Sequence, residues 1–320
     1  LDPCPIIIKI IQHPLRIYLR GCVPPFTLSG VDMQQLNLLL TSLPDGILLG
    51  FVYGLAAMGL TLIWGVMNVI NLAHGPIIAL GMFGTFFLFI RLGINPYLGL
   101  IPIAIVGLLL GVAIYFIAVH RVINAPHLSS LLATFSVNMI IIGLGTAAFT
   151  TSPYNVDFNM GSSKLGATTI LGTRVIAALI SILFTVGLYA FLQRTRPGKF
   201  IRAVTNNRDA AELMGVPSTR ILALSFGLGT MLAAVSGALI ATFFPFNILS
   251  GGGYELKSFV IGVLGGLGNP LGALAGGLVL GTLEGIIPKF LPTTWVPVLE
   301  FIFFIIILLV RPTGLFGAKK

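Results

Sequence analysis

Charged residues are the scarcest class in this 320-residue chain. Asp, Glu, Lys and Arg together make up 8% of it, whereas a soluble domain carries about 25%. None of them occurs between Gly46 and Ile90, and the mean hydropathy of the whole chain is +1.04. So little charge excludes an ordinary soluble domain and indicates a chain that crosses a membrane several times.

Further absences narrow the functional classes. The net charge is +9, but the aromatic residues are mainly phenylalanines inside apolar runs, so we expect no nucleic-acid partner. Two cysteines, Cys4 and Cys22, leave a disulfide and two free thiols equally open. No G-x-x-x-x-G-K-[ST] motif is present, so we expect the chain itself to bind no ATP. One histidine, His74, without a nearby Cys, His or carboxylate does not make a metal site.

Apolar runs of about 20 residues predict helices that cross the hydrocarbon core. The glycine-rich run 256–287 is too long for one crossing and is interrupted by "GLGNPLG", which predicts two shorter crossings or a re-entrant hairpin. The expected fold class is an all-α polytopic membrane protein with eight to nine transmembrane elements, some of them broken or re-entrant. The other predicted spans are 46–66, 75–91, 97–119, 128–150, 171–192, 219–244 and 295–310.

The loops predict the domain organisation and the orientation. Residues 1–45 are expected to be an interfacial or periplasmic extension, and residues 46–320 a single transmembrane domain. Loop 193–220 is the most basic and is therefore placed in the cytoplasm, with loop 151–170 outside. The cytoplasmic cations on this assignment are Arg121, Arg194, Arg196, Lys199, Arg202, Arg208, Arg220, Arg311, Lys319 and Lys320.

Within the basic loop, "NNRDAAELMGVPSTR" predicts a short helix over about 207–214. Asn206 or Asn207 can cap its start. Gly215 suits the left-handed residue that follows a helix, and Pro217 prevents its continuation. A helix of this length is unstable alone in water, so it must dock either under its own bundle or in a cleft of another protein.

A second polar stretch, "NVINLAHGP", interrupts the uncharged run. Asn68, Asn71 and His74 are spaced at i, i+3 and i+6. One interpretation is a hydrogen-bonded turn between two spans, in which side chains satisfy free backbone groups. The other is a polar lining of a solute route, because a broken helix offers backbone donors and acceptors to a zwitterion.

Few other polar groups lie inside the predicted spans, and such groups are functional candidates. Glu284 is expected either to form a boundary ion pair with Lys289 or to face the route. Glu300 lies in the last span, where contact with a partner subunit is one possibility. Asn138 either bridges helices or lines the route.

Glycines spaced four apart predict stripes along which two helix backbones approach closely. Packing within one chain, an interface between subunits and a position along a pore all remain open. The two stripes are Gly268, Gly272 and Gly276, and Gly277, Gly281 and Gly285.

Four blocks in one order resemble the branched-chain amino-acid permease family of ABC importers. They are "GLTLIWGVMNVINLAHG", the short helix ending in "GV", "VLGGLGNPLGALAGGLVLGTLEG" and the terminal "RPTGLFG". Pro76 departs from the family pattern, because several relatives carry an acidic residue there. An acidic substrate contact at that position is therefore not carried over.

The resemblance implies a vitamin-B12-importer-like permease fold in the inner membrane, and a non-catalytic subunit that forms half of a pathway for branched-chain or hydrophobic amino acids. It also implies a second homologous permease, two cytoplasmic ATPases that bind ATP and Mg, and a periplasmic substrate-binding protein. Pathway candidates are then Asn68, Asn71, His74, Asn138 and Glu284. The resemblance also implies a set of residues that face the ATPase. They are Asn207, Arg208, Glu212, Leu213, Met214 and Gly215.

Two other functions are consistent with the residues. One is an ABC permease for urea, amides or another small solute. The other is a secondary transporter driven by an ion gradient, which needs acids inside the spans. Only Glu284 and Glu300 are available for that role.

Overall fold

The computed structural model describes residues 33–165, 168–311 and 314. The first 32 residues of the predicted extension, with both cysteines, lie outside the described residues, as do the tail lysines. The helices are α1 (Met33–Met67), α2 (His74–Leu92), α3 (Leu100–Ile114) continued by the π-helix η1 (Tyr115–Val119), α4 (His127–Phe149), α5 (Gly172–Arg194), α6 (Arg196–Asn206), α7 (Arg208–Leu213), α8 (Ser218–Ile240), α9 (Ser250–Gly265), α10 (Pro270–Ile286), the 3-10 turns η2 (Ile287–Lys289) and η3 (Thr293–Trp295), and α11 (Val296–Val310).

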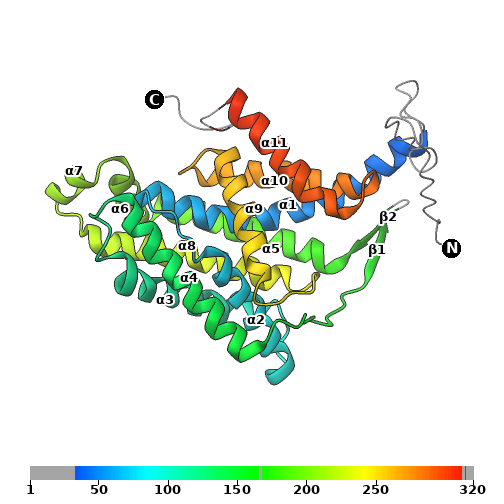
Figure 1. Cartoon of the computed structure of the whole chain (residues 1–320), viewed down its shortest axis with the longest axis horizontal. Coiled ribbons are helices and arrows are strands. Elements are labelled where there is room, and N and C mark those ends of the chain that lie inside the picture. Colours follow the sequence, from blue (N-terminus) through cyan, green and yellow to red (C-terminus); the bar gives the residue numbers. More distant parts are fainter. Residues whose placement is uncertain (1–32, 166–167, 312–313, 315–320) are drawn as a thin grey trace, which may run out of the picture.

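Eight helices in the described part of the chain are long and apolar enough to cross a membrane. The prediction of an all-α polytopic membrane protein is thereby confirmed. The glycine-rich run forms two helices, α9 and α10, which meet at the predicted break around Gly268-Asn269-Pro270. Helix α9 is shorter than a full crossing, and it runs across the direction of α1 in Figure 1.

Helices α1 and α8 form the centre of the bundle. In their most apolar windows 83% and 89% of the residues are buried, compared with 11% in α4 and in the last span. Helices α2, α3, α9 and α10 pack on this central pair. The exposed surfaces of α4 and α11 are apolar, as expected for helices that face lipid or another membrane subunit.

The glycine stripes pack within the chain. A Cβ added at Gly285 would lie 2.7 Å from Cα of Gly46, and one added at Gly50 would lie 2.8 Å from the carbonyl oxygen of Gly277. Backbones of α1 and α10 therefore touch along this stripe, where no larger residue fits. In the other stripe, Gly272 and Gly276 face α9, where a Cβ at Gly276 would lie 2.7 Å from the carbonyl oxygen of Ile261. Gly268 precedes α10 and approaches α1 instead, since a Cβ there would lie 3.2 Å from Cα of Gly65.

A β-hairpin and a helix, α6, were not predicted. Strands β1 (Ser162–Leu165) and β2 (Thr168–Leu171) form an antiparallel hairpin, with Ser162 opposite Leu171. Helix α6 begins directly after α5, because the side chain of Thr195 accepts a hydrogen bond from the Gly198 N–H at 3.1 Å. The threonine followed by a proline in the first turn is a start signal for α6 that the sequence did contain.

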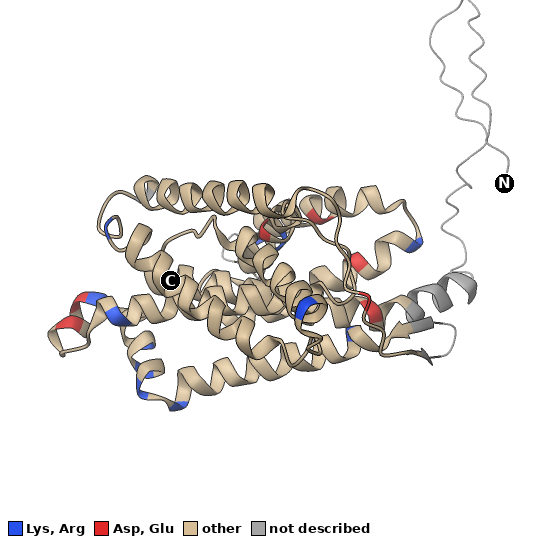
Figure 2. Cartoon of the chain, turned by 90° about the horizontal axis from the view of Figure 1, so that it is seen from below, with Lys and Arg blue, Asp and Glu red and all other residues tan. Residues whose placement is uncertain are grey.

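The hairpin and α7 lie at opposite ends of the long axis (Figure 1). This is the separation expected if loops 151–170 and 193–220 occupy opposite sides of a membrane. Figure 2 shows lysines and arginines gathered at the end that carries α6 and α7, while the ribbon between the ends carries few charged residues. The distribution fits the multi-pass inner-membrane location.

Candidate functional site

The polar break lies between α1 and α2. The Asn71 side chain accepts a hydrogen bond from the Ala73 N–H at 3.1 Å, and its backbone carbonyl accepts one from the His74 N–H at 3.2 Å. From α4, the Thr134 hydroxyl donates to the carbonyl of Ile70 at 3.0 Å. These bonds satisfy backbone groups that a broken helix leaves free inside the membrane.

His74, the first residue of α2, connects the break to the middle of α1. Its Nε2 lies 3.0 Å from the carbonyl oxygen of Ala56, and that oxygen can only accept, so Nε2 carries the hydrogen. His74 and Asn71 are both fully buried. Nδ1 of His74 and the amide nitrogen of Asn71 have no hydrogen-bond partner within the described chain. Helix α2 therefore starts deep in the bundle, with two polar atoms still unsatisfied.

Asn68 differs from the other two residues of the break. It is exposed and has a left-handed backbone, with φ of 53°, which asparagine tolerates better than most residues. It lines two cavities, of about 550 Å³ and about 370 Å³. Asn207 and Arg208 also line the smaller one. The fold thus brings the break and the start of α7 to one cavity, although they are far apart in the sequence.

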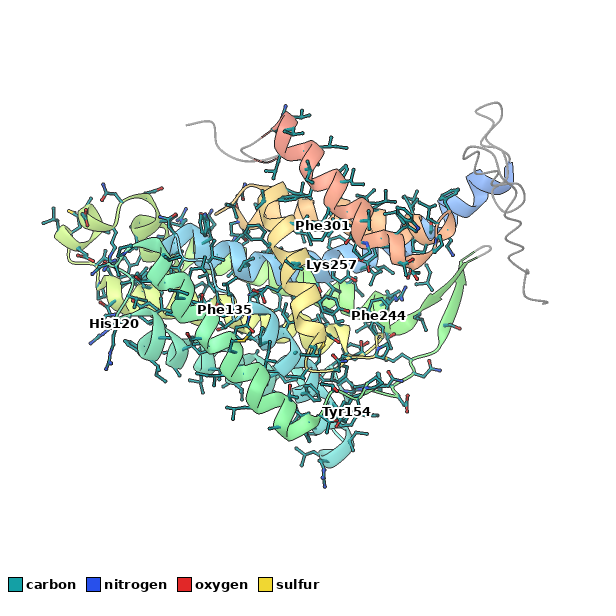
Figure 3. All side chains as sticks on the ribbon, viewed as in Figure 1. His120, Phe135, Tyr154, Phe244, Lys257 and Phe301 are labelled. Carbon is teal, nitrogen blue, oxygen red and sulfur yellow. The ribbon has the colours of Figure 1, made fainter. Side chains whose placement is uncertain are left out.

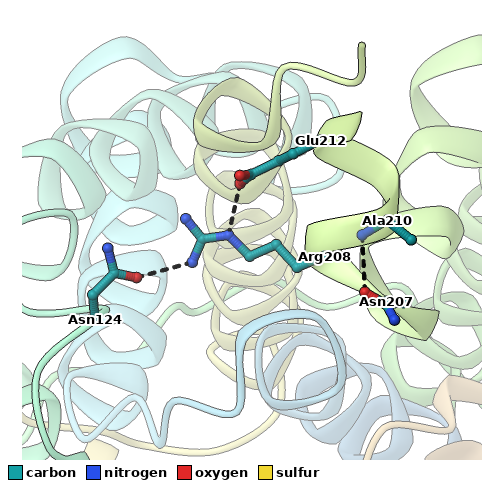
Figure 4. Close-up of polar contacts among 5 residues, drawn as sticks. All are labelled: Asn124, Asn207, Arg208, Ala210 and Glu212. Atoms are coloured by element: carbon teal, nitrogen blue, oxygen red, sulfur yellow. Dashed lines mark hydrogen bonds and ion pairs between the residues drawn. The ribbon is translucent and has the colours of Figure 1, made fainter. Parts of the chain in front are cut away.

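The predicted short helix is confirmed as α7. The Asn207 side chain accepts a hydrogen bond from the Ala210 N–H at 3.0 Å, so Asn207 is its N-cap (Figure 4). Gly215 has a φ of +81°, which is the left-handed conformation that the sequence predicted. Ala211 is buried, whereas Leu213 and Met214 are 89% and 85% exposed. Helix α7 therefore presents an apolar tip to its surroundings.

Arg208 connects α7 to the segment between α3 and α4. Its guanidinium donates to Glu212 Oε1 at 3.0 Å and to Asn124 Oδ1 at 3.2 Å (Figure 4). The bond from Arg208 lowers the pKa of Glu212, so this carboxylate is ionised at neutral pH. Asn124 was not predicted from the sequence, because its partner lies 84 residues away.

The expected pairing of Glu284 with Lys289 is wrong. Glu284 pairs with Lys257 of α9 at 2.5 Å and accepts a hydrogen bond from the Tyr53 hydroxyl at 3.1 Å, whereas Lys289 is exposed. Glu300 also faces Lys257, across 3.9 Å, and thus points into the chain. Lys257 is the single cation within the apolar glycine-rich run, a signal that the sequence did contain.

Asn138 lies on the sparsely covered helix α4. Asn138 as a whole is half-buried, but its Oδ1 atom is fully buried and has no hydrogen-bond partner in the described chain. Within the described residues, Oδ1 of Asn138 therefore forms no bridge to another helix.

Comparison with known proteins places this arrangement in a family. The family model described as branched-chain amino acid transport system / permease component matches residues 42–310. The chain is 30% identical over 302 residues to the high-affinity branched-chain amino acid transport system permease protein LivH of Salmonella typhimurium, which covers 90% of this chain and 98% of that protein. It is 29% identical over 310 residues to the permease protein BraD of the corresponding system of Pseudomonas aeruginosa, covering 90% and 99% of the two chains. The chain therefore belongs to the family of branched-chain amino acid transport permeases.

Proposed function

We propose that this chain is the membrane-spanning permease subunit of an ATP-driven importer for branched-chain amino acids. The observation that carries the proposal is α7, a short capped helix at one end of the bundle. Its apolar tip, formed by Leu213 and Met214, is almost fully exposed. The relatives are named as permeases of branched-chain amino acid transport systems.

The energy source is expected to be a separate protein. The sequence has no glycine-rich phosphate loop with its lysine, so ATP and Mg would be bound by a partner ATPase. In the assembly that we propose, two such ATPases, a second homologous permease and a periplasmic binding protein accompany this chain. The proposed ATPase contact surface consists of Asn207, Arg208, Glu212, Leu213, Met214 and Gly215.

The proposed mechanism starts when a loaded binding protein docks on the side opposite α7. ATP-driven closure of the ATPases then displaces α7. Arg208 would transmit this displacement to the α3–α4 connection through Asn124. The cavity shared by Asn68, Asn207 and Arg208 places the end of α1 next to the same moving element. Tilting of the spans would then alternate outward and inward access.

The proposed solute route passes the break after α1. Asn68 is the best-placed residue of the break, because it borders two cavities. Asn71 and His74 would contribute their unsatisfied nitrogen atoms, and Asn138 its unsatisfied oxygen, when the spans tilt. Glu284 would face the solute route while it stays paired with Lys257.

The proposal is tested by the replacement Gly215→Pro in the assembled transporter in proteoliposomes. Proline fixes φ near about −65° and cannot adopt the left-handed conformation that joins α7 to α8. ATP-driven leucine uptake should be lost, while the amount of protein in the membrane stays the same. Gly215→Asn is the matched control, because asparagine tolerates this conformation.

Normal uptake by Gly215→Pro would contradict the coupling role of α7. Uptake that survives without ATP but requires a proton gradient would point instead to a secondary transporter. ATP-driven uptake of urea in place of leucine would support the coupling role and contradict the substrate.

A further inference from the structure

Three charged side chains meet inside the membrane part of the bundle. They are Lys257 of α9, Glu284 of α10 and Glu300 of α11, with side-chain exposures of 21%, 18% and 6%. Figure 3 labels Lys257 on α9, which packs on both α1 and α11. Charged groups at such depth are costly and usually have a specific role.

The first carboxylate is fully paired. Glu284 Oε2 lies 2.5 Å from the Lys257 ammonium, and its Oε1 accepts a hydrogen bond from the Tyr53 hydroxyl at 3.1 Å. The same ammonium lies 4.9 Å from the centre of the Tyr53 ring. The single positive charge of the cluster is therefore already paired with Glu284.

The second carboxylate has no such partner. Glu300 Oε1 lies 3.9 Å from the Lys257 nitrogen, which is beyond hydrogen-bonding distance, and it is buried without any hydrogen-bond partner in the described chain. The cluster thus holds two carboxylates and one ammonium. A second buried negative charge is strongly unfavourable unless a cation neutralises it.

We propose that Lys257, Glu284 and Glu300 form a binding site for one proton, which is held on Glu300 and makes the cluster neutral. A metal ion fits poorly, because the Lys257 ammonium already occupies the space between the two acids and would repel it. The remaining titratable groups nearby are the neutral phenols of Tyr53 and Tyr254, whose rings lie 6.0 Å apart, and the carboxyl group of Glu255. Glu255 lies two residues before Lys257 on α9 and packs against Gly75 of α2. Lys289 is exposed.

The bound proton would hold α11 on the bundle. Glu300 is the only charged residue of α11, and few residues of this helix are buried. A neutral Glu300 can lie next to Glu284, whereas an ionised one is repelled by it. Loss of the proton should therefore loosen α11. This inference does not depend on the transported substrate or on the coupling role of α7.

The test compares the wild-type chain with Glu300→Gln in lipid nanodiscs, with infrared spectra and melting temperature recorded from about pH 4.5 to about pH 9, because an unfolded glutamate releases its proton at about pH 4.3. The wild type should show the band of a protonated carboxyl group and lose melting temperature as the pH rises. This sign follows because the protonated form is the stable one. The folded-to-unfolded ratio can fall by up to about tenfold for each pH unit. Glu300→Gln should lose the part of the band that Glu300 contributes, and its melting temperature should change less with pH than that of the wild type. Glu255 is common to both proteins and serves as the internal reference.

A second variant keeps the test decisive if Glu300→Gln does not fold. Glu284→Gln leaves one acid and one lysine in the cluster, so the part of the pH dependence that comes from Glu300 should also disappear. The proposal is overturned if either variant melts with the wild-type pH dependence, or if the wild type has no protonated carboxyl band. It is also overturned if replacing sodium by a large organic cation changes the melting temperature as much as raising the pH does.

Discussion

The break after α1 and the tip of α7 are opposite cases of residues in unexpected places. In the break, the polar side chains Asn71 and His74 lie in an apolar bundle and are fully buried. At the tip, the apolar side chains Leu213 and Met214 are 89% and 85% exposed. The first pair contacts its own backbone, and the second pair contacts almost nothing. A buried polar group with partners stabilises a fold, while an exposed apolar pair indicates a surface for a partner.

The largest effect is expected at the tip. Replacing both Leu213 and Met214 by Asp should lower leucine uptake by roughly 30-fold or more, the consequence of losing about 2 kcal/mol at a docking hot spot. The amount of folded chain should not change, because neither side chain is buried. The measurement is ATP-driven uptake, with co-purification of the ATPase as a second readout. Met160→Asp, an exposed apolar position in the connection between α4 and β1, is the matched control. Equal losses from both would mean that the tip has no special role.

An intermediate effect is expected inside the break. His74→Ala removes the hydrogen bond to Ala56 and leaves a cavity, which should lower the free energy of unfolding by about 2–4 kcal/mol. A melting curve in detergent measures this loss. Uptake per folded molecule should also fall, because the variant lacks the Nδ1 atom that His74 would offer to the solute. Unchanged uptake per folded molecule would remove His74 from the solute route.

The smallest effect is expected at Asn68, which belongs to the break but is exposed. Asn68→Ala should cost about 1–2 kcal/mol, because alanine is strained at a φ of 53°. Asn68→Gly removes the side chain without that strain, so its unfolding free energy should stay closer to that of the wild type. If uptake per folded molecule falls in both variants, the amide contacts solute. If it falls in neither, Asn68 shapes only the backbone.

Features that depend on neighbouring residues were predictable. The spans, the Asn207 cap, the left-handed Gly215 and the break near Asn269 all follow from local composition and turn chemistry. Helix α6 carries a local start signal at Thr195 and so belongs to the same class, although it was not predicted.

Features that depend on distant residues were not predictable. Glu284 has a lysine five residues later in the sequence, yet it pairs with Lys257, because α9 and α10 fold back on each other. Other pairs are further apart in the sequence: 231 residues separate Tyr53 from Glu284, and 84 separate Arg208 from Asn124. No periodicity within a single helix indicates which residue of another helix it will meet.

The sequence by itself determined that this chain lies in a membrane, where most of its spans lie, and which positions are small enough for close helix packing. Hydropathy, caps and glycine spacing act over a few residues, so they can be read along the chain. Only the tertiary structure decided that the stripe of Gly277, Gly281 and Gly285 meets α1, that Asn71 and His74 turn inward, and that two acids share one lysine. These outcomes depend on which helices pack together, and packing is a property of the whole bundle.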